Sequence, residues 1–79
     1  MKLTVVVPEH APAETREAAS KLEAADQAIR QSFSGFDVAD IVPEVRQSLG
    51  EIGLDLPDAT VLEYAGAVSE RADHVIHLD

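Results

Sequence analysis

Apolar side chains between Pro12 and Phe33 recur at steps of three and four residues, which is the period of an amphipathic helix. The sequence therefore predicts one long helix over residues 12–33. Proline suits the first position of a helix, and Gly35 supplies a stop just after the last one. The residues that share the predicted apolar face are Ala18, Leu22, Ala25, Ile29 and Phe33.

The charged side chains of this predicted helix mostly point away from that face. Glu17 with Lys21, and Asp26 with Arg30, are acid–base pairs four residues apart in the favourable order. Such a pair stabilises an isolated helix by about 0.2–0.5 kcal/mol. We therefore expect Arg30 to lie off the apolar face.

Two short segments near the ends of the chain have the composition of strands. Thr4 to Val7 is β-branched throughout, which favours a strand over Lys2–Val7 that Pro8 ends. The run does not alternate polar with apolar residues, so both of its faces are expected to be covered. A second strand is predicted over His74–Leu78.

The middle of the chain predicts a second helical segment that a proline interrupts. Asp37 is a suitable capping residue, and the apolar positions after it have helical spacing. Pro43 would cost about 3 kcal/mol inside a helix. We therefore expect a short turn over 37–41 and a helix proper that begins near Pro43 and stops between Gly50 and Gly53. The apolar positions are Val38, Ile41, Val42, Val45 and Leu49.

A third helix is predicted after Asp58, which can cap it. Its apolar positions are Val61, Ala65, Val68 and Ala72, broadened by Leu62 and Tyr64. The expected fold is thus a small α+β domain over residues 1–79, dominated by helices, in the order strand–helix–helix–helix–strand.

Charge is unevenly distributed along this predicted domain. The chain has 15 acidic and 6 basic residues, a net charge of −9, and residues 37–79 hold ten of the acids against only Arg46 and Arg71. Such a surface repels nucleic-acid phosphates and anionic lipids and attracts basic proteins. We expect no direct binding to nucleic acid or membranes, and a protein partner with a basic surface. A role in solubility alone is the alternative. The candidate contact residues are Asp37, Asp40, Glu44, Glu51, Asp55, Asp58 and Glu63.

No motif in the sequence predicts catalysis. The chain has no cysteine, no phosphate-binding glycine loop with its lysine and no nucleophile elbow. His74 and His77 are three apart, so on a strand they would point to opposite faces and would not share a metal ion. The segment Gly50–Gly53 has the G-x-x-G spacing of the KH module, but it carries an acid and is better explained as a helix stop. We predict no enzyme, catalytic residue, cofactor or metal site.

The acidic segment carries one resemblance to a known family. Gly35-Phe36-Asp37-Val38, Glu44–Leu49 and Gly53–Pro57 with Ala59-Thr60 resemble the second half of an acyl carrier domain. In that family an acidic second helix meets partner enzymes, and a serine carries the phosphopantetheine arm. Val38 stands where this serine would be, and Pro43 makes the following segment one residue longer. The resemblance thus implies a carrier-like helical protein that lacks the phosphopantetheine serine.

The predicted function is therefore protein–protein interaction through the acidic second half, as an adaptor, inhibitor or assembly subunit. The alternatives are the carrier-like protein and a nucleic-acid mimic that occupies a basic groove of a DNA-binding protein. The apolar run at the start is too short for a signal peptide or a membrane span, so we expect a cytoplasmic protein.

The N-terminal strand raises the question of self-association. Because Val5, Val6 and Val7 are consecutive, at least one of them must point away from the helices. An exposed apolar strand edge is normally covered or paired. We therefore expect a homo-oligomer or an obligate complex that forms through this strand.

Overall fold

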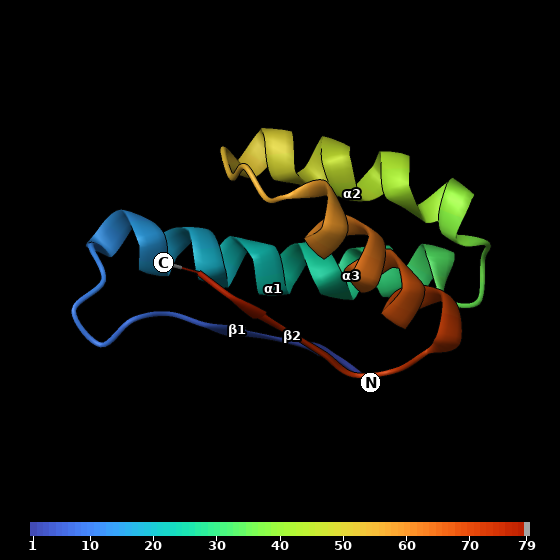
Figure 1. Ribbon diagram of the computed structural model, residues 1–79, viewed down its shortest axis with the longest axis horizontal. Coiled ribbons are helices and arrows are strands. Elements are labelled where there is room, and N and C mark those ends of the chain that lie inside the picture. Colours follow the sequence, from blue (N-terminus) through green and yellow to red (C-terminus); the bar gives the residue numbers. More distant parts are fainter. Residues whose placement is uncertain (79) are drawn as a thin grey trace.

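The computed structural model, which describes residues 1–78, has the predicted α+β order of a strand, three helices and a strand. The elements are β1 (Leu3–Val6), α1 (Ala13–Phe33), α2 (Val38–Ile52), α3 (Asp58–Glu70) and β2 (His74–His77). Figure 1 shows them in layers, with the two strands at one side, α1 and α3 in the middle and α2 at the far side. Helix α2 contacts both α1 and α3 but not the sheet.

The two strands pair in parallel, and Leu3 of β1 lies opposite His74 of β2. A parallel pair needs a long crossover connection, which the three helices provide. Within β1 and β2 alternate residues face the helices, so Leu3 and Ile76 are buried while Val6 and Val75 are 41% and 49% exposed. The prediction that both faces of the first strand are covered is therefore wrong. One face of this small sheet lies against the helices and the other is open.

The core lies where α1, α2 and α3 meet under the sheet. Apolar side chains from every element contribute, and Ile41, Ala65 and Val68 are fully buried. Burial of a large aliphatic side chain stabilises the fold by about 1.5–3 kcal/mol. Tyr64 is buried among them, whereas Leu62, which was expected to broaden the apolar face of α3, is 51% exposed.

Helix α1 begins and ends close to the predicted positions. Pro12 is the N-terminal cap residue rather than the first helical residue, and the helix ends at Phe33. Gly35 adopts a positive φ of 84° in the turn that follows. That angle is readily available to glycine, which explains why the chain turns here.

The buried face of α1 differs from the predicted one. Asp26 and Arg30 form the ion pair that their spacing predicted, but they are 2% and 9% exposed and belong to the interior. The apolar stripe is correspondingly rotated, because Ala19 is buried while Ala18 and Ala25 are half-buried. The expectation that Arg30 lies off the buried face is wrong because distant residues, described below, supply its surroundings.

Helix α2 runs without a break through Pro43, so the predicted turn over 37–41 and late helix start are wrong. Ile41 before the proline and Val45 after it are buried on one face, while the proline itself is exposed. Burial of these two side chains outweighs the local cost of the proline. The C-terminal stop is as predicted, because the helix ends at Ile52 and Gly53 is a left-handed cap with φ of 85°.

No helix among residues 1–78 is both long and apolar enough to cross a membrane.

Candidate functional site

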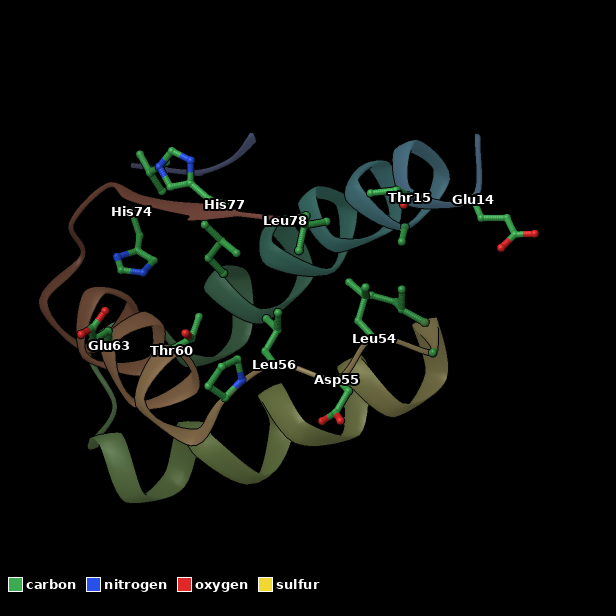
Figure 2. Close-up of a pocket in the computed structure, with 16 residues that line it drawn as sticks. Glu14, Thr15, Leu54, Asp55, Leu56, Thr60, Glu63, His74, His77 and Leu78 are labelled. Atoms are coloured by element: carbon green, nitrogen blue, oxygen red, sulfur yellow. The ribbon is translucent and has the colours of Figure 1, made fainter. Parts of the chain in front are cut away.

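A groove lies between the C-terminal strand and the connector that joins α2 to α3 (Figure 2). Its volume is about 810 Å³, within the range of about 300–1,000 Å³ that is typical of binding sites. Strand β2 forms one wall, Leu54–Pro57 forms the opposite wall, and the first turns of α1 and α3 close the ends. The groove therefore draws together three parts of the chain that are far apart in the sequence, within residues 14–18, 52–63 and 74–78.

Two histidines flank β2 at this groove. His74 is half-buried and points toward α3, where its ring lies 6.1 Å from the ring of Tyr64. His77 is exposed and lies on the opposite side of the strand (Figure 2). They occupy opposite faces, as the sequence predicted. Among the residues that the structure describes, no group of three or more histidine, aspartate or glutamate side chains could hold a metal ion.

Three exposed acids surround the groove. Asp55 from the connector and Glu63 from α3 are two of the seven predicted contact residues, and Glu14 comes from the first turn of α1. Glu14 was missed because the charge excess of residues 37–79 singles out the other half of the chain. The lining contains no lysine or arginine. The groove therefore favours positively charged groups.

The other predicted contact residues lie elsewhere. Asp37, Asp40, Glu44 and Glu51 are spaced three, four and seven residues apart along α2, so they follow one side of that helix. All are exposed except the half-buried Glu44. Asp58 is exposed and lies 3.1 Å from Arg46, with which it forms a surface ion pair. The structure thus separates the predicted acids into an α2 stripe, a groove pair and one paired residue.

A buried polar cluster ties β1, α1 and α3 together beside the core. Asp26 accepts hydrogen bonds from the backbone amide of Leu3 at 3.0 Å, from Nε of Arg30 at 2.7 Å and from the hydroxyl of Tyr64. The guanidinium of Arg30 also lies 6.0 Å from the centre of the tyrosine ring. One carboxylate thereby satisfies donors from three elements. The Asp26 carboxylate therefore connects β1, α1 and α3 through hydrogen bonds.

The same cluster contains two donors without acceptors. Both Nη atoms of Arg30 are buried and have no hydrogen-bond partner within residues 1–78. A cavity of about 420 Å³ adjoins the cluster near Met1 and Lys2. Asp26 and Arg30 are among the residues that line this cavity, whereas the two Nη atoms themselves are buried. Within residues 1–78, Asp26 is the only carboxylate that forms an ion pair with the Arg30 guanidinium.

Tyr64 gives this cluster a pH dependence. Burial, and then the neighbouring Asp26 carboxylate, raise the pKa of Tyr64 well above its ordinary value of 10.0. The folded state therefore keeps the tyrosine proton above pH 10 while the unfolded state loses it, so stability falls as pH rises there. We expect the free energy of unfolding to decrease by up to about 1.4 kcal/mol per pH unit above pH 10. Urea denaturation across this range measures the slope.

The control for this prediction is Tyr64→Phe, because Tyr64 is the only tyrosine in the chain. The variant should start less stable, since Asp26 loses a donor, but its stability should fall less steeply above pH 10. If the free energy of unfolding of the variant fell equally steeply above pH 10, the pH dependence would come from groups other than Tyr64.

The outer edge of β1 is covered by α1. Leu3 donates its amide to Asp26, and Val5 donates its amide to Glu23 at 3.1 Å. A strand that joined this edge would have to displace both carboxylates. Self-association through Val5, Val6 and Val7 stays a prediction, and the group best placed for it is Val6, on the open face of the sheet.

Val38, where a carrier domain would bear its modified serine, is the first residue of α2 and is half-buried. It offers no hydroxyl for a prosthetic group. No protein-family model matches the chain, and no curated protein or solved structure is significantly similar to it, so the arrangement of charges and strand edges is the basis for any statement about function.

Proposed function

We propose that this domain is a non-catalytic protein-binding module whose acidic surface contacts a basic partner. The observation that supports the proposal is that the predicted contact acids, apart from half-buried Glu44, are exposed, and that only Asp58 among them has an ion pair within residues 1–78. Free carboxylates on a surface attract basic proteins over several ångströms and speed their association.

The charges are divided between two regions that a partner could contact separately. One is the α2 stripe, which runs from Asp37 to Glu51, and the other is the groove with Asp55 and Glu63. The groove adds apolar side chains from the connector, so it supplies buried area as well as charge. Affinity at interfaces comes mostly from buried groups, while exposed charges set association rate and salt dependence.

The test compares two triple variants that change net charge equally. Asp40→Asn, Asp55→Asn and Glu63→Gln remove three acidic charges from the second half, and Glu9→Gln, Glu17→Gln and Glu23→Gln remove three from the first half. A partner is captured from a lysate of the source organism on the immobilised domain, identified, and its affinity measured. We expect the first triple variant to weaken binding at least about fivefold, and the second by less than about twofold.

The salt dependence supplies a second readout for the same partner. Affinity of the unchanged domain should fall with rising salt, and the second-half variant should show a shallower decline because fewer ion pairs remain to be screened. Equal weakening by both variants, or no salt dependence, would contradict the proposal and leave solubility as the role of the charge.

A further inference from the structure

One edge of the sheet is open. His74 and Leu78 donate their amides to the carbonyl oxygens of Lys2 and Val6, at 3.1 and 2.8 Å. Alternate residues of a strand direct their amide and carbonyl groups to the same side, so those of Val75 and His77 point away from β1. Within residues 1–78 the sheet has no further strand on that side. Two amides and two carbonyls of β2 are thus available for pairing.

This contrasts with the other edge of the sheet. There, the outward amides of Leu3 and Val5 are occupied by Asp26 and Glu23 from α1. Folded proteins usually cover or blunt their free edges in such ways. The fold covers the edge of β1 and leaves the edge of β2 open.

The open edge lies in the groove described above. All of β2 lines it, and Leu54 and Leu56 line the facing wall (Figure 2). These two leucines are half-buried and pack on the core, so they present part of their apolar surface to the groove. An extended chain laid along β2 would have backbone partners on one side and apolar contacts on the other.

The charges of the groove specify the chemistry of that chain. Glu14, Asp55 and Glu63 come from three different elements and surround the cavity, with no lysine or arginine in its lining. A second copy of this domain would bring the same acids against themselves, and each copy carries a net charge of −9. A segment that carries lysine or arginine would instead be attracted by the acids of α1, α3 and the connector.

We propose that the groove binds an extended segment of a partner protein, bearing basic side chains, which pairs with β2 as a third strand. The inference rests on the proposed protein-binding function and names where and how the partner docks. Addition of a strand to an open sheet edge is a known mode of peptide recognition, in which backbone hydrogen bonds supply affinity and alternate side chains supply specificity. The four residues of β2 set the length of the pairing.

The experiment uses a short blocked peptide in which valine alternates with arginine, and a second peptide in which glutamate replaces arginine. Backbone amide NMR spectra and amide hydrogen exchange of the full chain are recorded with each. We expect the arginine peptide to slow exchange at the amides of Val75 and His77 at least about tenfold, since they gain acceptors. We expect the glutamate peptide not to bind.

Two methylated forms of the arginine peptide test the pairing itself. N-methylation of every valine, or of every arginine, removes the amides that face one side of an extended chain. We expect one form to lose binding and the other to keep it, because only alternate amides face β2. Equal binding of both forms would overturn the third-strand proposal.

Two double variants with equal charge change locate the site. Asp55→Lys with Glu63→Lys alters the groove, and Asp40→Lys with Glu51→Lys alters the α2 stripe. We expect about a tenfold loss of affinity for the arginine peptide in the first and less than about threefold in the second. Equal losses would overturn the groove as the site while leaving the proposed function intact.

Light scattering and amide hydrogen exchange of the free chain test whether a second copy of the domain, rather than a partner segment, pairs with β2. We expect the Val75 and His77 amides of the free chain to exchange freely, including in any oligomer that forms through Val6. A dimer in which these amides are protected without peptide would overturn the proposal, because a second copy would then fill the edge. Failure of the arginine peptide to bind at all would overturn it as well.

Discussion

Replacing Asp26 by asparagine should unfold much of the protein at ordinary temperatures. The side chain is 2% exposed and its carboxylate is the counter-charge of Arg30, which is itself buried. Removal of one partner of a buried ion pair costs about 3–5 kcal/mol, because an uncompensated charge stays in the interior. Asparagine also presents a donor where the carboxylate accepted hydrogen bonds from Leu3, Arg30 and Tyr64.

The expected loss is large against the total stability of a domain of this size, which is about 0.05–0.15 kcal/mol per residue. We therefore expect the midpoint of thermal unfolding to fall by tens of degrees, measured by circular dichroism at fixed concentration. The matched control is Glu23→Gln. Glu23 also accepts an amide of β1, that of Val5, but it is exposed. We expect a loss of about 1 kcal/mol or less for this control.

A second substitution separates charge from packing. In the Asp26→Asn background, Arg30→Met removes the stranded cation while keeping an apolar chain of similar length. We expect part of the lost stability to return, so that the two substitutions are not additive. Additive losses, or a mild effect of Asp26→Asn alone, would show that the ion pair does not hold β1, α1 and α3 together.

The element order was predictable because it depends on local pattern. Helical spacing over residues 12–33, the β-branched run at Thr4–Val7 and the glycine stops at Gly35 and Gly53 are each readable from a few neighbouring residues. The structure confirms the five elements and places their ends within one or two residues for α1, β1 and β2. The parallel pairing of the strands could not be predicted in the same way, because it depends on how three helices pack between them.

The buried cluster was not predictable from local pattern. Asp26 and Arg30 look like a surface pair because aspartate and arginine are mostly exposed in folded proteins. Their burial depends on Leu3 and Tyr64, which are 23 and 38 residues from Asp26 in the sequence. Tyr64 could have indicated the cluster, because it lies in an apolar helix and a buried tyrosine hydroxyl normally needs a hydrogen-bond partner.

The groove also depends on tertiary structure. The charge excess of the second half predicted Asp55 and Glu63 as contact residues. It predicted the acids of the α2 stripe equally, and it did not include Glu14, which also lines the groove. The open edge of β2 becomes identifiable when the hydrogen bonds of β1 are known, because α1 covers one edge and leaves the other. The sequence pattern indicates an exposed strand edge at residues 5–7, whereas the edge that the helices leave open belongs to β2.

Replacing Pro43 by alanine should make the protein more stable. Proline inside a helix lacks the amide that would bond to the carbonyl of Ala39, and its ring presses on that same carbonyl, at a cost of about 3 kcal/mol. Helix α2 nevertheless continues through Pro43, and the proline is exposed, so its replacement by alanine leaves the buried side chains of the helix in place. The greater freedom of alanine in the unfolded chain offsets about 0.4–1 kcal/mol of the gain.

We therefore expect a net gain of about 2 kcal/mol, which raises the midpoint of thermal unfolding by roughly 8–16 °C. Gly50→Ala is the matched comparison in the same helix. Gly50 is exposed and has open space where a methyl group would lie, so its gain of about 1 kcal/mol reflects helix propensity alone. Pro43→Ala should exceed this gain. If it instead leaves stability unchanged, α2 would be shown to bend at the proline to place Ile41 and Val45, and the packing of those two side chains would depend on the bend.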